Sequence, residues 1–331
     1  MAVPRRALAV ASALSVAVVA CGGTAPRVSS SLAPTAAIAP SAAPSPSLAP
    51  ESVRPGPSRI ETGTFPSAAL QRVMPYATYL PAGYDADAQT RYPVLYLLHG
   101  LSGSNEEWQQ YAVPQAADQL IESGEIPPLL IVFPQGDQAY WVDHANGGPR
   151  WGLYSARDVV REIDARYRTL ANRRYRAVGG LSMGADGALQ LSLNYPDAFG
   201  VAGAHSPVLR RFGDAPSYFG DQAQFAARDP YTLALARPQV ARTITLWIDI
   251  GEGDPWRPRI LAFHDALTAA GIPHTLREYP GSHSAEYWSS HAPDYLRFYG
   301  AALCGARDVA RPDRPAASCP APRHASASPA P

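Results

Sequence analysis

The pattern Gly180-x-Ser182-x-Gly184 restricts the local fold more than any other feature of this 331-residue chain. Residues 175–178 before it suit a short buried strand, and residues 185–193 after it are rich in alanine and leucine, which favours a helix. The pattern therefore predicts a strand, a tight turn and a helix, with glycines making room for a strained backbone. A serine on such a turn has its hydroxyl near backbone N–H groups at the helix N-terminus. We interpret Ser182 as a nucleophile, with an ordinary turn that contains serine as the alternative.

Short apolar runs alternate with helical patterns in the central part of the chain. Apolar runs without polar alternation are typical of strands in a mostly parallel central sheet with helices on both faces. The expected strands are residues 94–98, 129–133, 177–178, 201–204, 245–248 and, nearer an edge, 274–279. The expected helices are residues 113–123, 155–167, 189–193 and 259–270. Residues 73–80 can add an antiparallel hairpin at one edge, so the sequence predicts an α/β fold.

The 28 basic residues of the chain balance its 28 acidic residues, so the formal net charge is zero. This balance offers no basic surface to nucleic acid, and we expect no nucleic-acid partner. Every basic residue is an arginine, because the chain contains no lysine. The lack of lysine excludes Schiff-base chemistry, serine–lysine dyads and S-x-x-K sites. If Ser182 is a nucleophile, we therefore expect histidine to be its base.

The first twenty residues have the pattern of a signal peptide. Two arginines precede an apolar run that is too short to span a bilayer comfortably. Residues 18–21, with the sequence VVAC, resemble the lipobox of bacterial lipoproteins, in which the cysteine becomes the lipidated first residue. We predict that residues 1–20 are removed and that lipid on Cys21 anchors the protein outside the cytoplasm. The alternative is an ordinary signal peptide and a secreted protein.

Composition divides the rest of the chain into three parts. Residues 21–57 are dominated by alanine, proline and serine, and we expect a disordered tether. Residues 58–307 have the length of one α/β domain, and residues 308–331 should be a disordered tail. In an oxidising compartment Cys304 and Cys319 could form a disulfide, and two free thiols are the alternative.

A serine hydroxyl needs a base to take its proton and a third group to orient that base. His283 lies in a loop after an expected strand and before an expected helix, where the carboxyl edge of a parallel sheet places functional groups. The other histidines after the serine are His205, His264, His274, His291 and His324. We predict that His283 is the base.

Three carboxylates near the end of the 245–248 strand compete as the group that orients the base. Asp249 continues the strand pattern and is better explained as a structural residue. Glu252 and Asp254 lie in the following glycine-rich loop, from which a carboxylate can reach an imidazole. We predict Asp254, with Asp249 and Glu252 as alternatives.

Attack on an ester carbonyl creates an oxyanion that needs two aimed hydrogen-bond donors. One is the backbone N–H of Met183, the residue after the nucleophile. The other is expected after the strand that ends at His99 and Gly100, where a sharp turn lets Leu101 present its N–H. An ordinary turn at the end of the strand is the alternative for this second position.

Several longer motifs accompany the serine pattern, and together they are far more specific. They are YLPAGY at residues 79–84, YPVLYLLHG at 92–100, GLSMG at 180–184, DAFG at 197–200, the loop 251–254, and GSHS at 281–284 with Trp288. Over most of residues 76–300 the chain resembles the putative-esterase family, which includes esterase D, feruloyl esterase domains and the antigen 85 mycolyltransferases. The resemblance implies an α/β-hydrolase fold, a triad at Ser182, Asp254 and His283, and oxyanion donors at Leu101 and Met183.

The chain departs from the family pattern at two places. After the serine motif, relatives commonly continue with Gly-Gly or Gly-x-Gly, whereas here Asp186 stands early in the expected helix. A carboxylate is favourable there, but it could also perturb His283 if it faced the site. Residues 204–207 read AHSP where relatives often have a Ser-Gly pair, which could alter the pocket without touching the triad.

Aromatic residues gather in the loop before the 155–167 helix, and loops at this position often line ligand clefts. From this loop we propose Trp141 and His144 as pocket residues. We add His205, which follows an expected strand, and Trp288, which lies in the expected helix after His283. Plain packing of the loop is the alternative. Residues 208–241 hold further aromatic side chains and could form a partial lid.

These observations predict an exported serine carboxylester hydrolase that works through an acyl-enzyme and needs no cofactor and no metal. Its substrate would be an acetyl, feruloyl or lipid ester, carried by a small molecule, a polysaccharide or a lipid. Acyl transfer of the mycolyltransferase type is the second hypothesis, since it shares the first half-reaction. A catalytically silent binding protein with the same fold is the third.

Overall fold

The computed structural model describes residues 56–304. The predicted signal peptide, Cys21, nearly all of the tether, the tail and Cys319 lie outside the described residues, so their assignments stay predictions. Cys304, at the end of the described part, is buried. In the described part, no helix is both long enough and apolar enough to cross a membrane.

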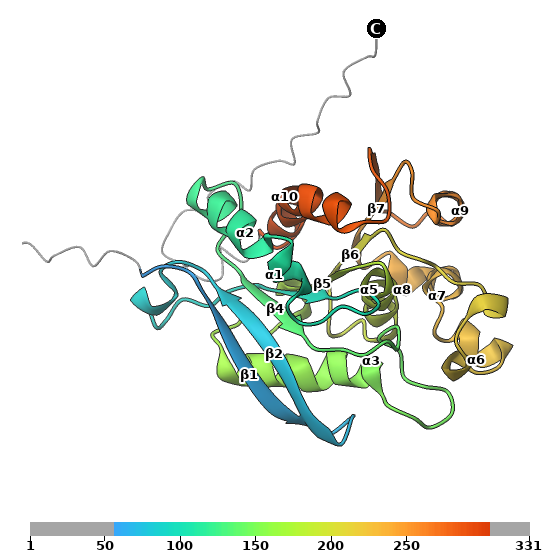
Figure 1. Ribbon diagram of the computed structural model, residues 1–331, viewed down its shortest axis with the longest axis horizontal. Helices are drawn as coiled ribbons and strands as arrows, with labels where there is room; N and C mark the ends of the chain where they lie inside the picture. Colours follow the sequence, from blue (N-terminus) through green and yellow to red (C-terminus); the bar gives the residue numbers. More distant parts are fainter. Residues whose placement is uncertain (1–55, 305–331) are drawn as a thin grey trace, which may run out of the picture. The chain divides into compact units, whose positions relative to one another are not determined.

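Within residues 56–304, eight strands form one sheet in the order β1-β2-β4-β3-β5-β6-β7-β8. Their bounds are β1 Arg59–Ser67, β2 Arg72–Leu80, β3 Val94–Leu98, β4 Leu130–Pro134, β5 Arg176–Leu181, β6 Val201–His205, β7 Thr245–Gly251 and β8 Thr275–Tyr279. β1 and β2 are an antiparallel hairpin at one edge, β2 is antiparallel to β4, and the other pairs are parallel. The predicted mostly parallel sheet with an edge hairpin is confirmed (Figure 1).

The apolar runs in the sequence correspond to the strands in the middle of the sheet. Every residue of β3, β4, β5 and β6 is buried, as expected for strands covered on both faces. β8 at the far edge has no fully buried residue: Glu278 is exposed and the other residues are only partly buried. This difference explains why its sequence mixes polar and apolar residues, and it confirms the prediction of an edge strand.

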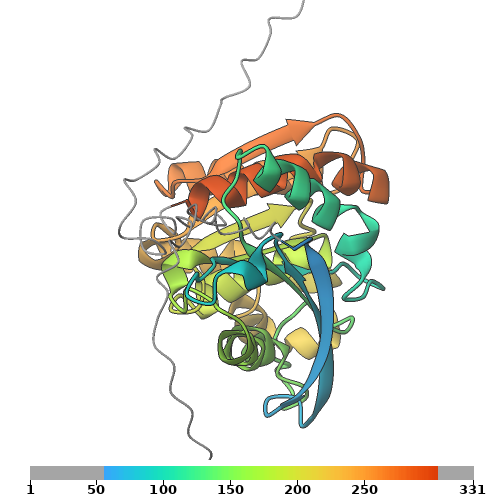
Figure 2. The ribbon, with the colours of Figure 1, turned by 90° about the vertical axis from the view of Figure 1, so that its left-hand side faces the viewer.

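The helices form two layers, one on each face of the sheet. They are α1 Glu107–Gln110, α2 Val113–Glu122, α3 Trp151–Leu153, α4 Val160–Arg166, α5 Met183–Asn194, α6 Gln222–Ala226, α7 Pro230–Ala236, α8 Pro238–Ala241, α9 Arg257–Ala269 and α10 Ala285–Ala302. α1, α2 and α10 share one hydrophobic core with the sheet, while α4, α5, α7 and α9 contribute to the other. α2 and α10 pack side by side (Figure 2). The fold is the α/β-hydrolase fold.

The predicted helix at 155–167 begins earlier than expected. The turn α3 leads into a π-helical segment, Tyr154–Val159, which continues into α4. The side chains predicted to share the inner face are buried, among them Val159, Ile163 and Tyr167. The periodicity therefore located the buried face correctly but missed the aromatic turn at the N-terminal end.

Two glycines let α10 approach the centre of the sheet. Gly179 on β5 and Gly203 on β6 are paired across neighbouring strands. A Cβ atom on either glycine would overlap the hydroxyl of Tyr299 from α10. The hydroxyl can thus reach the sheet only because both positions lack a side chain.

Candidate active site

Ser182 lies at the turn between the end of β5 and the first residue of α5. Its backbone has φ 53° and ψ −117°, a conformation that residues other than glycine rarely adopt. Its amide donates a 3.0 Å hydrogen bond to the carbonyl oxygen of His205 on β6, which helps to hold the turn. Backbone strain held in this way by surrounding structure is common at functional sites.

The close approach of backbone segments requires both glycines of the motif. A Cβ atom on Gly180 would overlap the carbonyl of Gly184. A Cβ atom on Gly184 would overlap the carbonyl of Leu98 and lie 2.7 Å from the carbonyl oxygen of His99. The first turn of α5 therefore packs directly against the end of β3, which brings the loop after β3 beside Ser182.

Ser182, His283 and Asp254 form a continuous hydrogen-bonded chain. The Nε2 atom of His283 lies 2.8 Å from the Oγ atom of Ser182, and its Nδ1 atom lies 2.7 Å from the Oδ2 atom of Asp254. Since a carboxylate only accepts hydrogen bonds, Nδ1 carries the proton and Nε2 keeps a lone pair for the serine hydroxyl. The structure thus brings together the three residues that the sequence predicted, in the geometry that a nucleophile, its base and an orienting acid require.

The loops that carry Asp254 and His283 are fastened to each other. The amide of Gly253 donates a 2.8 Å hydrogen bond to the carbonyl of Gly281, which has φ 125°. Asp254 is buried, and its second carboxylate oxygen accepts the amide of Trp256 at 2.8 Å. Both oxygens of the acid are therefore engaged, which fixes its direction toward the imidazole.

The alternative acid, Asp249, belongs to a different buried network. Its carboxylate accepts hydrogen bonds from His205 Nδ1 at 2.6 Å and from the hydroxyls of Tyr287 at 2.9 Å and Tyr295 at 3.0 Å. The other nitrogen of His205 bonds to the hydroxyl of Tyr299 at 2.9 Å, and the His205 side chain is fully buried. The prediction that His205 lines the pocket is therefore wrong, because both ring nitrogens are used inside the core.

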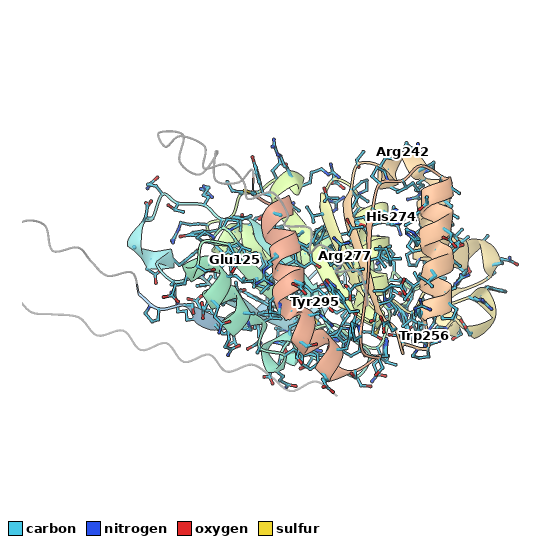
Figure 3. The ribbon with its side chains drawn as sticks, turned by 90° about the horizontal axis from the view of Figure 1, so that it is seen from above. Glu125, Arg242, Trp256, His274, Arg277 and Tyr295 are labelled. Atoms are coloured by element: carbon cyan, nitrogen blue, oxygen red, sulfur yellow. The ribbon has the colours of Figure 1, made fainter. Side chains whose placement is uncertain are left out.

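The remaining candidates for base and acid lie elsewhere. Glu252 is exposed. His264 on α9 and His274 contact each other through ring nitrogens 2.7 Å apart, and Figure 3 places His274 beside α9. His291 on α10 stacks on Tyr279 with ring centroids 4.1 Å apart. His324 lies outside the described residues.

Trp141 is a core residue rather than a pocket residue, which corrects the sequence prediction. The side chain is 1% exposed and packs where a Cβ atom on Gly136 or Gly187 would collide with its ring. Its indole N–H donates to the carbonyl of His99 at 3.3 Å. The alternative reading of the aromatic loop, plain packing, is thus correct for Trp141, and Tyr154 is buried as well.

The other two predicted pocket residues differ in their surroundings. The Trp288 ring packs edge-on against the His283 imidazole, with centroids 4.9 Å apart, so it borders the candidate base. Its buried indole nitrogen has no hydrogen-bond partner within the described residues. His144 stacks on Tyr218 with centroids 4.3 Å apart. A role for His144 in binding substrate stays a prediction.

The two backbone amides predicted as oxyanion donors have no partner in the described part of the chain. Met183 is the first residue of α5, and its N–H precedes the hydrogen-bonded turns of that helix. Leu101 lies in the turn after β3 and is 47% exposed. Neither amide donates a hydrogen bond to another described residue, so both remain able to bind a ligand oxygen.

Asp186, the departure from the family pattern, does not contact His283. Its buried carboxylate accepts the backbone N–H groups of Val208 at 2.9 Å and Leu209 at 3.1 Å. These residues follow β6 in a loop where Ser206 and Leu209 both have positive φ. Burial raises the pKa of Asp186 to about 7. Asp186 therefore ties α5 to a strained loop next to the site.

Two further side chains, His99 and Glu107, contact the loop after β3, and neither was predicted from the sequence as part of the site. The Nδ1 atom of His99 lies 2.8 Å from the Gly100 carbonyl oxygen, and Glu107 accepts the Gly100 amide at 2.7 Å. A histidine directly after a buried apolar strand is the sequence signal that could have identified the first. Within residues 56–304, no three histidine, cysteine or acidic side chains are grouped as ligands for a metal ion.

The chain matches the model of the family described as Putative esterase over residues 67–299. Esterase Rv1288 of Mycobacterium tuberculosis is 31% identical, in an alignment that covers 62% of this chain and 51% of that protein. An endo-1,4-beta-xylanase/feruloyl esterase of Xylanibacter ruminicola is 31% identical over 44% of this chain and 21% of its own length. The chain thus spans about half or less of the length of these curated relatives.

Solved structures show the same fold. A ferulic acid esterase superposes with a TM-score of 0.67 and 26% identity, covering 75% of this chain and 99% of its own. FphF, a fluorophosphonate-binding serine hydrolase of Staphylococcus aureus, gives a TM-score of 0.64 at 20% identity, covering 74% and 99%. The family model covers well over half of the chain, from the first strand to the last helix. The protein therefore belongs to the Putative esterase family.

Proposed function

We propose that this protein is a serine carboxylester hydrolase that works through an acyl-enzyme. The observation that carries the proposal is the chain of hydrogen bonds from Asp254 through His283 to Ser182, at 2.7 and 2.8 Å. Membership of the esterase family supports the same reaction class. The strained turn at Ser182 and the unpartnered amide of Met183 supply the further elements that acyl transfer to serine needs.

In the first half-reaction, Nε2 of His283 takes the hydroxyl proton while Ser182 Oγ forms a bond to the ester carbonyl carbon. The carbonyl oxygen gains negative charge, and the amides of Leu101 and Met183 stabilise it. The tetrahedral intermediate then breaks its bond to the alkoxy oxygen, which leaves as an alcohol with the proton from the imidazolium. Asp254 orients the ring and stabilises its positive charge while the proton is on Nε2.

In the second half-reaction, water gives a proton to Nε2 of His283 and attacks the acyl carbon. The carboxylic acid leaves as Ser182 regains its proton, so the enzyme is restored. An alcohol in place of water would give acyl transfer by the same steps. Feruloyl esters are the first substrates to test, because a feruloyl esterase is among the similar sequences and a ferulic acid esterase among the similar structures. Acetyl and lipid esters follow.

The nucleophile can be tested with a fluorophosphonate probe. We expect the probe to label the folded protein at Ser182 and Ser182→Ala to lose both labelling and turnover of p-nitrophenyl acetate. His283→Ala should abolish turnover, because no other described histidine contacts the serine hydroxyl. Wild-type protein that is folded but neither labelled nor active would refute the proposal. A panel of acetyl, feruloyl and long-chain esters, with and without alcohol acceptors, separates hydrolysis from acyl transfer.

We also propose that the protein is exported and held at the membrane by lipid on Cys21. The support is the sequence pattern of residues 1–21 alone. An alkynyl fatty acid fed to expressing bacteria should label the wild-type chain and sediment with it in the membrane fraction. Cys21→Ala should remove the label and release the protein; release of an unlabelled wild-type chain would instead favour secretion.

A further inference from the structure

The peptide group between Gly100 and Leu101 couples the orientation of the Gly100 carbonyl to that of the Leu101 N–H. Its carbonyl belongs to Gly100 and its N–H belongs to Leu101, the proposed oxyanion donor. A trans peptide is planar and its C=O and N–H point in opposite directions, and the described residues contain no cis peptide bond. Any contact that fixes the direction of the Gly100 carbonyl therefore fixes the direction of the Leu101 N–H.

His99 holds that carbonyl. Its Nδ1 atom lies 2.8 Å from the Gly100 carbonyl oxygen. The amide of Gly136 points at the other ring nitrogen, Nε2, at 2.9 Å, so Nε2 accepts and cannot carry a proton in the neutral ring. The proton is on Nδ1, which donates to Gly100. The side chain is 2% exposed, and burial lowers the pKa of His99, which favours this neutral, donating form.

A second contact closes the turn around the same carbonyl. The amide of Gly103 donates to the Gly100 carbonyl oxygen at 3.1 Å, and Ser102 between them has φ 65°. These features are those of a β-turn with Leu101 at its second position. The carbonyl thus accepts one hydrogen bond from the turn and one from the buried imidazole, and the Leu101 N–H on the far side of the peptide stays unpaired.

Glu107 holds the preceding peptide group. Its Oε2 atom accepts the Gly100 amide at 2.7 Å, and the carboxylate lies so close to Gly103 that a Cβ atom there would be 2.6 Å from it. The next residue, Trp108, donates its indole N–H to the carbonyl of Leu98 at 2.9 Å. Two consecutive residues of α1 therefore fasten the end of β3 and the start of the loop.

Tyr111, the residue directly after α1, connects Glu107 to the side chains around the candidate base. The hydroxyl of Tyr111 donates to Oε1 of Glu107 at 3.3 Å. The Tyr111 ring stacks on Trp288, with centroids 6.4 Å apart and planes at 22°, and Trp288 packs on His283. Glu107 is thus connected to His283 through the rings of Tyr111 and Trp288.

We propose that His99 and Glu107 are positioning residues that hold the Gly100–Leu101 peptide and so aim the Leu101 N–H as an oxyanion donor. The inference rests on the proposed esterase function. It assigns the two side chains no contact with substrate. A donor that is already aimed needs no reorientation when charge develops on the substrate oxygen, and this is the origin of its effect on rate.

Paired variants at each position test the proposal. His99→Ala removes the donor to Gly100, whereas His99→Asn can present an amide N–H near the place of Nδ1. Glu107→Ala removes the acceptor, whereas Glu107→Gln keeps an oxygen for the Gly100 amide. His264→Ala, on α9, is the matched control. All are compared by kcat per active site, counted with the fluorophosphonate probe, together with KM for p-nitrophenyl acetate and the Tm.

We expect both alanine variants to lose about 10- to 100-fold in kcat per active site with little change in KM, because one oxyanion donor is misaligned rather than removed. His99→Asn and Glu107→Gln should recover most of the loss. The Ki of a trifluoromethyl ketone, which forms a tetrahedral oxyanion on serine, should rise by the same factor as kcat falls. Such a parallel change is not expected from a residue that only stabilises the fold.

Three results would overturn the inference. If the alanine variants keep the wild-type kcat per active site and the wild-type Ki, the Gly100–Leu101 peptide does not need His99 or Glu107 to hold its orientation. A lower Tm and fewer countable sites, with normal kcat per site, would make both residues structural only. If His99→Ala does not fold, Glu107→Ala decides between these outcomes. Wild-type protein without turnover or labelling would refute the esterase proposal itself, a result distinct from the other two.

Discussion

The imidazole of His205 and the carboxylate of Asp249 form a buried pair with 2.6 Å between Nδ1 and Oδ2. The pair has nearly the same geometry as His283 and Asp254, which are 2.7 Å apart. The two pairs differ in the partner of the second ring nitrogen, Nε2. In His205 this nitrogen hydrogen-bonds to the hydroxyl of Tyr299, whereas in His283 it hydrogen-bonds to the hydroxyl of Ser182. One histidine–aspartate pair therefore joins β6, β7 and α10 in the core, and the other faces the candidate nucleophile.

This difference predicts opposite effects for the two Asp→Asn variants. Asp254→Asn should lower kcat by about 10³- to 10⁴-fold, because an amide can hold the imidazole in the wrong tautomer. Its Tm should change little. Asp249→Asn should lower the free energy of unfolding by about 2–4 kcal/mol, since several buried donors lose a charged acceptor. Kinetics with active-site counting and chemical denaturation measure both; the reverse pattern would make Asp249 the acid.

The backbone role proposed for Leu101 can be separated from its side chain. Leu101→Ala keeps the N–H and should keep kcat within a few-fold. Leu101→Pro removes the N–H and should lower kcat by about 10²- to 10³-fold, the usual effect of losing an oxyanion donor. Proline suits the second position of a β-turn, so the loop should tolerate it. Equal kcat values for the two variants, both with wild-type Tm, would place the donor elsewhere.

Asp186 should make stability depend on pH. Its pKa in the folded protein is about 7, well above the usual aspartate pKa of 3.8, because burial and the nearby Asp229 outweigh Arg210 and the backbone donors. Because the folded-state pKa is raised above the unfolded-state value of 3.8, the protonated Asp186 contributes its full stabilisation of the fold below pH 3.8. This contribution is lost as the pH rises through about 7.

The test variant is Asp186→Asn, whose amide oxygen can still accept the Val208 and Leu209 amides. Between about pH 5 and about pH 8 the Tm of the wild-type protein should fall more than that of the variant, because only the carboxylate ionises. Thermal unfolding at both pH values measures the difference. Parallel Tm curves for the two proteins would contradict the assignment.

The contact between α10 and the sheet predicts a steric effect. Gly203→Ala would place a methyl group against the Tyr299 hydroxyl and should destabilise the protein by about 1–3 kcal/mol. Gly213→Ala is the control, since a Cβ atom there meets nothing within 4 Å. Adding Tyr299→Phe should recover part of the loss, because the overlapping atom is the hydroxyl oxygen. A double-mutant cycle by chemical denaturation measures this coupling; additive losses would argue against the contact.

Much of the fold could be predicted because the signals are local. The apolar runs at β3, β4 and β6 reflect burial on both faces, and the mixed sequence of β8 reflects an edge. The glycines around Ser182 likewise indicate a crowded turn. The crowding comes from residues close in sequence and from the end of β3. Such patterns record how each residue is buried, and burial is enough to place strands and helices.

The hydrogen-bond and packing partners of individual residues were harder to predict, because sequence signals are local and these partners are distant in the sequence. Trp141 stands in an aromatic loop and His205 directly after a strand, and both positions are typical of pocket residues. Both side chains are nevertheless packed in the core by segments far away in the sequence. Asp186 could not be explained until the loop at Val208 was seen to fold back on it. A sequence pattern does not show which distant group satisfies a polar side chain.

The sequence by itself determined the alternation of strands and helices over most of the domain, the strained turn at Ser182 and a short list of acids and bases. Only the tertiary structure decided that Asp254, rather than Asp249, meets His283, and that His99 and Glu107 hold the loop at Gly100. The physical reason is that hydrogen bonds act over about 3 Å. Residues separated by many positions come within that distance only when the sheet and both helical layers are assembled.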